Sequence, residues 1–382
     1  MFKTLSELKQ VFSVSDLRSV IFFVTGNCNL RCRFCFYSAN LNRHDDLSLE
    51  QIRTIARTTG PFWKLLVSGG EPFLRTDLVE ILSEFRRYCG IETIDLPTNG
   101  WYTDRIVSTV EEFCTRHPDV QLTITISLDA MGDLHDRLRQ APGCFERAVG
   151  TLKALSGLKL RFPRLRTVVC SVLTQENARS LGELFDFVRD HLPEADEHSV
   201  EIERDSDRTT ADFGVRRGLT DDLMRLVLKS LAIVRARVRR PRRNRGVPVA
   251  VSRLMHSGMV LTSTRLKIAR IHGKLWPFRC VAGRSIVVIN SRGELSPCEL
   301  RPEKIDLARY GYDVGQAMRS SEFAKTTQRI VCERCDCTHS TFLVQSMRQS
   351  GLFFLTRVPL AGLVDRWDSE DPHDPVAPPP EG

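Results

Sequence analysis

The stretch "GNCNLRCRFCFY", residues 26 to 37, places Cys28, Cys32 and Cys35 within eight positions. A structural zinc site gains stability from a closed tetrahedral set of ligands, so three thiolates leave one position vacant. An iron–sulfur cube held by three cysteines keeps one iron unsaturated, and that iron can bind a small chelating molecule. The spacing therefore raises the question of a fourth ligand that comes from outside the protein.

The composition is otherwise that of a globular protein. Of the 382 residues, 42% are hydrophobic, which is enough to bury a sizeable core. No apolar run reaches the roughly 18 residues that span a bilayer, and the polar start lacks the apolar core of a signal peptide. We therefore expect a cytoplasmic location, where the 12 cysteines are metal ligands or buried thiols rather than disulfides.

Two segments stand out by charge or hydrophobicity. The Arg-rich run "RARVRRPRRNR" at 235–245 supplies part of the net charge of +8. It is either a solvated charge run or a contact for a phosphate-bearing substrate, nucleic acid or acidic lipid headgroups. The apolar segment "GLFFLTRVPLAGLVDRW" at 351–367 either packs on the core or touches a membrane, and we expect packing.

Strand-like and helix-like segments alternate between residues 19 and 204 with a period of about 30 residues. Strands are expected at 19–26, 63–69, 91–99, 120–129, 165–173 and 198–204, and helices at 48–59, 76–88, 104–116, 145–157 and 178–192. Six strands with intervening helices predict an α/β fold with a parallel sheet and right-handed crossovers, spaced as in a βα barrel, complete or open. Catalytic residues in that architecture lie where the strands end, and the three-cysteine segment directly follows the first strand.

The segment "CNLRCRFC", with the aromatic Phe34 just before the third cysteine, resembles the signature of the radical S-adenosylmethionine (SAM) enzymes. The resemblance implies a partial (β/α)6 TIM-like barrel in which the three cysteines hold a [4Fe–4S] cluster and SAM chelates its fourth iron. Reductive cleavage of SAM then yields a 5′-deoxyadenosyl radical that abstracts a hydrogen atom from an unactivated carbon. It also implies a reducing partner such as flavodoxin or ferredoxin.

The segment "SGGEP" at 68–72 ends the second expected strand. Its glycines, Gly69 and Gly70, let the backbone approach a ligand closely, and Glu71 adds an acceptor for an ammonium group. In the family, a GGE segment at this place grips the SAM amino group.

Polar residues also end the third and fourth strands, in "PTNG" at 97–100 and "SLDA" at 127–130. Asn99 and Asp129 are either SAM contacts or ordinary caps. The stretch "HDRLR" at 135–139 resembles the HDxxR stretch of the superfamily, which implies that Ser127 meets the ribose and Arg139 the SAM carboxylate. The planar fork of arginine pairs with a carboxylate bidentately. We assign no catalytic side chain beyond the cluster and SAM.

A second cysteine group follows residue 276. It consists of Cys280, Cys298, Cys332, Cys335 and Cys337. A hairpin is predicted between the first two, in "SIVVINSRGELSPC", with the turn at "NSRG". The spacing from Gly293 to Cys298 resembles the start of the auxiliary-cluster domains called SPASM and twitch.

That resemblance implies one auxiliary [4Fe–4S] cluster. Its ligands would be Cys280, Cys298, Cys332 and Cys335, with Cys337 spare or substituting for a neighbour. A full SPASM domain has seven cysteines, and Thr341 stands where another cysteine is expected, so a single cluster is favoured. Zinc is the alternative, because spacing alone does not separate the two metals; linkage to a radical SAM core favours the cluster.

We therefore expect five segments along the chain. These are an N-terminal segment (1–18), a radical SAM core barrel (19–204), a basic insertion with one helix at 219–238 (205–275), a small cysteine-rich SPASM/twitch-like domain (276–345) and a C-terminal segment with a disordered tail (346–382).

The leading hypothesis is a radical SAM oxidoreductase or maturase. Its substrate is either a small polar metabolite, oxidised or epimerised, or a side chain of a peptide or protein. Fewer than 20 residues precede the first strand, which favours the small molecule, although a separate recognition protein could supply a leader-binding domain.

Two other functions compete with this hypothesis. A non-catalytic iron–sulfur or zinc protein could bind nucleic acid through its basic insertion, but it would not need "SGGEP", Ser127 or Arg139. A radical SAM methylase would call for a cobalamin-binding region or extra catalytic cysteines, which we do not identify.

Overall fold

The computed structural model describes residues 17–203, 217–237, 249–333 and 337–363. Most of the Arg-rich run, Cys335 and the tail from residue 364 lie outside the described residues.

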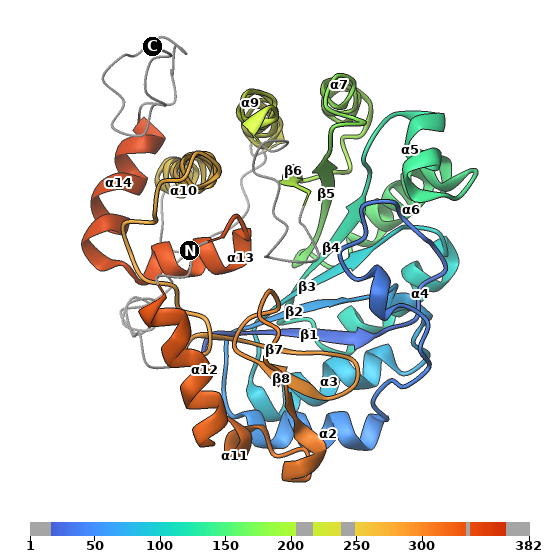
Figure 1. The fold of residues 1–382 in the computed structure, drawn as a ribbon. Coiled ribbons are helices and arrows are strands. Elements are labelled where there is room, and N and C mark those ends of the chain that lie inside the picture. The colour runs from blue at the N-terminus through green and yellow to red at the C-terminus, as the bar shows by residue number, and fades with distance from the viewer. Residues whose placement is uncertain (1–16, 204–216, 238–248, 334–336, 364–382) are drawn as a thin grey trace.

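One nine-stranded sheet organises the chain, in the order β6-β5-β4-β3-β2-β1-β7-β8-β9 (Figure 1). Its first six strands are β1 (Ser19–Thr25), β2 (Lys64–Gly69), β3 (Thr93–Thr98), β4 (Gln121–Ser127), β5 (Leu165–Leu173) and β6 (Glu197–Ile202). Neighbours among these six pair in parallel throughout. The predicted α/β fold with a parallel, TIM-like partial barrel is confirmed.

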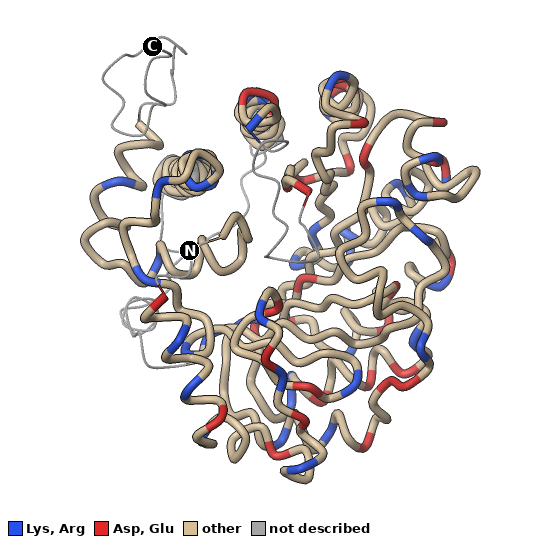
Figure 2. Tube along the Cα trace, in the orientation of Figure 1, with Lys and Arg blue, Asp and Glu red and all other residues tan. Residues whose placement is uncertain are grey.

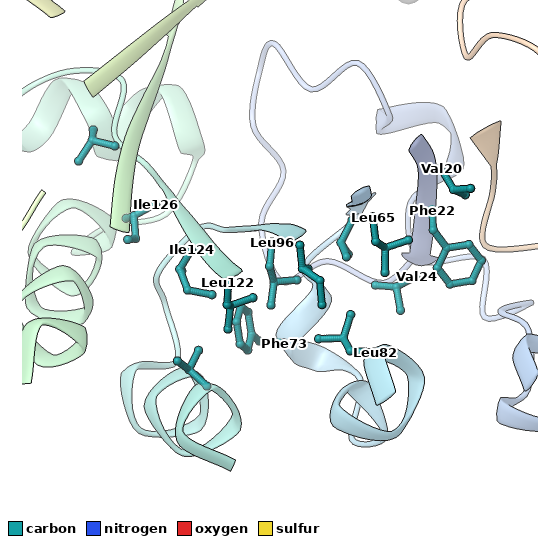
Figure 3. Close-up of a cluster of buried hydrophobic side chains, with 14 of the residues drawn as sticks. Val20, Phe22, Val24, Leu65, Phe73, Leu82, Leu96, Leu122, Ile124 and Ile126 are labelled. Atoms are coloured by element: carbon teal, nitrogen blue, oxygen red, sulfur yellow. The ribbon is translucent and has the colours of Figure 1, made fainter. Parts of the chain in front are cut away.

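Helices cover one face of this sheet (Figure 1). They are α2 (Leu49–Thr59), α3 (Leu78–Cys89), α4 (Thr103–Arg116), α6 (Cys144–Leu158) and α7 (Leu181–His191), close to the predicted ranges. The helix α2 begins at Ser48 with the reciprocal hydrogen bonds of a capping box to Gln51. Alternate strand side chains such as Val20, Phe22 and Val24 enter the core on this side (Figure 3).

The predicted hairpin is present as β7 (Ile286–Ile289) and β8 (Glu294–Ser296), which pair antiparallel. Strand β7 also pairs in parallel with β1, so the hairpin extends the barrel sheet, which the sequence did not predict. All four residues of β7 are buried, and pairing with β1 satisfies a backbone edge that would otherwise stay open. A short strand, β9 (Ile305–Asp306), continues the sheet.

The remaining helices form the C-terminal part. They are α9 (Thr220–Arg237), α10 (Val249–Ile271), α11 (Val314–Met318), α12 (Ser321–Cys332), α13 (Ser340–Gln349) and α14 (Gly351–Leu363). A further helix, α5 (Gly132–Arg139), belongs to the barrel and lies between β4 and β5 in the sequence. The helix α9 matches its prediction, whereas α10 was not predicted. Among the described residues, no helix is long and apolar enough to cross a membrane.

Two glycines set the contact between α10 and α14. A Cβ atom at Gly258 would lie 1.9 Å from the carbonyl oxygen of Val358, and one at Gly362 would lie 2.2 Å from that of Leu254. Only glycine allows the two backbones to approach this closely. The apolar segment that begins at residue 351 therefore packs on the protein along one face, as expected.

Candidate functional site

The cysteine loop leaves β1 at the carboxyl edge of the sheet and is held there by side chains further along the chain. Asp46 accepts hydrogen bonds from the backbone nitrogen of Gly26 at 2.7 Å and from Asn27 Nδ2 at 3.1 Å. The backbone nitrogen of Cys28 donates to Asn42 Oδ1 at 2.9 Å. Sequence reasoning missed Asp46 and Asn42, because neither lies in a recognisable motif.

The three thiols of this loop are partly buried and interact with one another. Burial raises the pKa of Cys28 to about 12, and the negative charges of Glu71, Cys32 and Cys35 add to that rise. Burial likewise raises the pKa of Cys32 and of Cys35. No group of three or more potential ligand side chains in the described part of the chain is arranged as a metal site. The loop thus brings the three thiols near one another, but their side chains are not arranged as a metal site in this structure.

Gly69 and Gly70 bring the end of β2 against the cysteine loop. Gly70 N donates to Thr25 O at 2.9 Å, and Glu71 N donates to Asn27 O at 2.8 Å. A Cβ atom at Gly69 would lie 2.2 Å from Thr25 O, and one at Gly70 would lie 2.1 Å from Asn27 O. The close approach expected toward a ligand is therefore, in this structure, an approach to the protein's own backbone.

The carboxyl group of Glu71 is buried and has protein partners on both oxygens. Oε1 accepts from Thr98 Oγ1 at 2.9 Å and from Phe73 N at 3.3 Å, and Oε2 accepts from Asn99 N at 2.8 Å. Burial raises its pKa to about 7 despite these hydrogen bonds. The side chain thus ties the end of β2 to the end of β3, and its contact with the SAM amino group stays a prediction.

Asn99 connects β3 to the cysteine loop. Its Nδ2 donates to Asn29 Oδ1 at 2.9 Å, and its Oδ1 accepts from Trp101 N at 3.0 Å. Ser127 ends β4, is half-buried and pairs in register with Cys170 of β5. Both residues therefore lie at the same edge of the sheet as the cysteines.

Asp129, His135 and Arg139 form a buried cluster beneath the cysteine loop. Asp129 Oδ2 accepts from Arg139 Nε at 2.8 Å and from Nη2 at 2.7 Å. The backbone nitrogen of Asp129 donates to His135 Nδ1 at 3.0 Å. The helix α5 places His135 and Arg139 one turn apart, so that both reach Asp129.

The Arg139 guanidinium also reaches the cysteine loop. Its carbon lies 5.7 Å from the ring centre of Phe34, and it hydrogen-bonds the Cys32 side chain. Burial disfavours its charge, but the carboxylate of Asp129 outweighs burial and raises the pKa of Arg139. The guanidinium expected to meet the SAM carboxylate is thus paired with Asp129 in this structure, and its contact with SAM stays a prediction.

A hollow of about 160 Å³ opens beside this cluster, where β5 and β6 end. It is lined by Arg33, Phe34, Leu138, Thr174, Gln175, Glu176 and Glu203. Arg33 and Glu176 form an exposed ion pair across 2.9 Å at its rim.

The face of the strands opposite to α2, α3, α4, α6 and α7 carries polar side chains toward α10 and α13. Cys170 pairs in register with Ser127 on one side and Ser199 on the other, and burial raises the pKa of Cys170 to about 12. Glu201 of β6 accepts from Lys267 Nζ of α10 at 3.0 Å and from Ser340 Oγ of α13 at 2.5 Å. The helices α10 and α13 are thus both bonded to β6 through the carboxylate of Glu201.

The second cysteine group is only partly gathered. Cys280 and Cys298 are buried in one apolar cluster, and Cys337 packs against the same cluster. Cys332 ends α12 and is exposed, and Cys335 lies outside the described residues. Cys337, expected as the spare thiol or as a substitute for a neighbour, thus packs against the cluster that contains Cys280 and Cys298, whereas Cys332 is exposed.

Residues 22–188 match the family model described as the radical SAM superfamily. The chain therefore carries a radical SAM domain, as the cysteine signature predicted. This class implies SAM and a [4Fe–4S] cluster as cofactors.

Curated proteins similar to the chain are enzymes. It is 26% identical over 179 residues to a probable GTP 3′,8-cyclase of Methanocaldococcus jannaschii, covering 46% of this chain and 56% of that protein. It is 28% identical over 187 residues to an Fe-coproporphyrin III synthase of Methanosarcina barkeri, covering 47% of this chain and 43% of that protein. It is 31% identical over 172 residues to a pre-heme d1 synthase of Dinoroseobacter shibae, covering 43% of this chain and 39% of that protein. The chain thus spans about half the length of the curated relatives that it matches.

Solved structures extend the likeness beyond the barrel. SuiB of Streptococcus suis is 16% identical, with a TM-score of 0.54 and coverage of 89% of this chain and 74% of SuiB. Native anSMEcpe with bound AdoMet is 14% identical, with a TM-score of 0.56 and coverage of 91% and 99%. At these identities the likeness concerns the fold alone.

Proposed function

We propose that the chain is a radical SAM enzyme that abstracts a hydrogen atom from a carbon of a small polar metabolite, which is thereby oxidised or epimerised. The observation that carries the proposal is the loop of Cys28, Cys32 and Cys35, fixed at the carboxyl end of β1 within the matched domain. Cysteine thiolates are the ligands that iron–sulfur clusters take, so these three residues fit the cluster's first three positions. When bound there, cluster and SAM supply the radical chemistry.

The chain's own residues position these groups. We infer that Gly70 and Glu71 fix the cysteine loop against β2, since their backbone nitrogens donate to Thr25 and Asn27. The carboxyl group of Glu71 joins this corner to β3, because it accepts from Thr98 and Asn99. Asp129 holds the guanidinium of Arg139 beside Cys32. The positive charge of Arg139 there offsets the negative charges of the thiolates and of a SAM carboxylate. Our candidates for SAM contacts at this edge remain Gly69, Gly70, Glu71, Asn99, Ser127, Asp129 and Arg139.

We propose one auxiliary [4Fe–4S] cluster at the second cysteine group, with zinc as the alternative. Cys280, Cys298 and Cys337 share one apolar cluster, which supports them as ligands. The fourth expected ligand, Cys335, lies outside the described residues. A reducing partner such as flavodoxin or ferredoxin and a cytoplasmic location complete the proposal.

The face of the strands toward α10 and α13 supports a polar substrate. Ser127, Cys170, Ser199 and Glu201 lie on adjacent strands there, and Ser340 of α13 reaches Glu201. A peptide substrate is the alternative, because related folds were solved with peptides: SuiB with its precursor peptide SuiA, and anSMEcpe with the Cp18Cys peptide.

The Glu201→Gln variant tests this assignment. The change removes the charge that pairs with the buried Lys267, so we expect product formation to fall by about 10- to 100-fold, on the order of 1.4 to 3 kcal/mol. SAM cleavage without product should persist, because the cysteine loop is untouched. The assay is anaerobic reconstitution with SAM and dithionite, followed by mass spectrometry against metabolites from enzymes encoded by neighbouring genes.

The matched control is Glu112→Gln, whose side chain is about half-exposed on α4 and pairs with nearby Arg116. Equal product formation by the two variants would show that Glu201 does not face the substrate. A mass change in a supplied peptide, with none in any metabolite, would replace the small-molecule proposal by the peptide one.

A further inference from the structure

The inner face of the sheet, defined here as the face toward α10 and α13, changes from apolar to polar along the strand order. On β1 and β7 it carries Ile21, Phe23, Ile286 and Val288, which are buried in one apolar cluster. Strand side chains alternate between the two faces, so every second residue of the other strands also points inward.

From β3 to β6 these inward residues are largely polar or charged. In register they are Asp95, Thr123, Thr125, Ser127, Arg166, Cys170, Glu197, Ser199 and Glu201. Both basic and acidic positions are found among the strands of the sheet (Figure 2). Parallel sheets are normally apolar on both faces, so this polar half-face needs a reason other than folding.

Solvent reaches the polar half-face, although its strands lie in the middle of the sheet. Lys64 of β2 and Asp95 of β3 form an ion pair, and their side chains are 25% and 31% exposed. The side chain of Glu201 is 38% exposed, although it is bonded to both α10 and α13. The half-face is therefore hydrated and is not closed by packing.

Arg348 of α13 adds a cation to this half-face. Its charge interacts with that of Asp95, and burial lowers the pKa of Arg348 against this attraction. Asp95 is already paired with Lys64, and Arg348 has no hydrogen bond or ion pair among the residues that the structure describes. Lys267, by contrast, pairs with Glu201. A guanidinium held away from bulk water without a partner costs stability, so the fold alone does not account for Arg348.

The last turn of α13 offers a different reason for an arginine, because a cation is favourable at the C-terminal end of a helix. Arg57 has the same place in α2 and is exposed. An exposed side chain is enough for that role. The role therefore does not explain why Arg348 lies near Asp95 in the sheet.

We propose that Arg348 binds an anionic group of the substrate, a carboxylate or a phosphate. The planar guanidinium pairs with either anion through two parallel hydrogen bonds. Asp95 is in register with Thr123, four residues before Ser127, which corresponds to about 13 Å along the strand. A small metabolite together with the arginine side chain bridges this distance to the edge where the cysteine loop lies. This inference rests on the proposed function and narrows its substrate from a polar metabolite to an acidic one.

Thermal unfolding of the reconstituted protein with small anions tests the inference. The probes are sodium phosphate and sodium succinate, each compared with sodium chloride at equal ionic strength, so that the phosphate and the carboxylate are tested separately. We expect at least one probe to raise the Tm of the wild type by about 1 °C or more. The Arg348→Gln variant should lose this rise, because it has no guanidinium. Its Tm without a probe should be no lower than that of the wild type.

The matched control is Arg57→Gln, which removes an exposed arginine from the last turn of a helix. Phosphate also stabilises proteins without occupying a specific site, so the rise is compared between variants in the same salt. The control should keep the full rise. Arg348→Lys keeps the charge at the helix end but loses the planar fork, so it should lose most of the rise, and it serves if the glutamine variant does not fold.

A rise that the Arg348 variants retain would overturn the inference, and so would the absence of a rise with both probes. A product of the reconstituted enzyme that carries neither a carboxylate nor a phosphate would overturn it as well. The unfolding measurement does not depend on SAM cleavage. A protein that binds a probe through Arg348 but does not cleave SAM would therefore contradict the proposed function and leave the anion site in place.

Discussion

Replacing Cys28, Cys32 and Cys35 together by alanine is expected to abolish 5′-deoxyadenosine formation while leaving the metal of the second cysteine group in place. The three thiols lie on one loop and are the proposed ligands of the SAM-binding cluster, so no partial site remains. The measurement is anaerobic SAM cleavage with dithionite, followed by chromatography. Persistent 5′-deoxyadenosine in the triple variant would contradict the assignment.

The same variant reports on the second cysteine group. About four irons and four sulfides per chain should remain if that group encloses a cube. Adding Cys337→Ala should remove them, whereas Cys332→Ala is the control that should not, because Cys332 is exposed and Cys337 packs against the apolar cluster that contains Cys280 and Cys298. One zinc and no sulfide would overturn the auxiliary cluster.

Changing Gly70 to alanine is expected to have the second largest effect. The new Cβ would lie 2.1 Å from Asn27 O and 3.1 Å from Cys28 Cβ, so the backbone of the cysteine loop must move. We expect the free energy of unfolding to fall by about 2 to 4 kcal/mol and the reconstituted protein to lose most of the iron of the first site. Urea unfolding and iron analysis after reconstitution measure the two effects.

The matched control is Gly150→Ala in the middle of α6. A Cβ atom there meets no other atom within 4 Å, and alanine favours a helix over glycine by about 1 kcal/mol. This variant should be as stable as the wild type or more so, and should keep its iron. If Gly70→Ala behaved like Gly150→Ala, the tight contact between β2 and the cysteine loop would not matter to the site.

Much of the fold could be predicted from the sequence because the local signals agree with one another. The strand at 19–26 and the helix that starts at Ser48 follow from apolar runs and a capping box, and both are present. The pairing of β7 with β1 could not be predicted, since a four-residue apolar strand carries no mark of its neighbour. The helix α10 was missed because it begins in a segment of proline and arginine and has no strong polar face.

The candidate site divides in the same way. The cysteine spacing and "SGGEP" pointed to the correct edge of the sheet, since both lie at strand ends. The partners of Glu71 and Arg139 could not be predicted, because they depend on which donors the tertiary fold brings near a buried charge. Asn99, at the end of β3, donates to Glu71. Asp129, just after β4, pairs with Arg139 of α5.

Electron paramagnetic resonance of the dithionite-reduced protein, recorded with and without SAM, tests the central claim most directly. The account predicts that SAM changes the signal of the first cluster, because one iron there is open to it, and that the signal remaining in the Cys28, Cys32 and Cys35 triple variant does not respond. A reduced wild-type signal that is indifferent to SAM would contradict the claim that this loop forms a SAM-binding site.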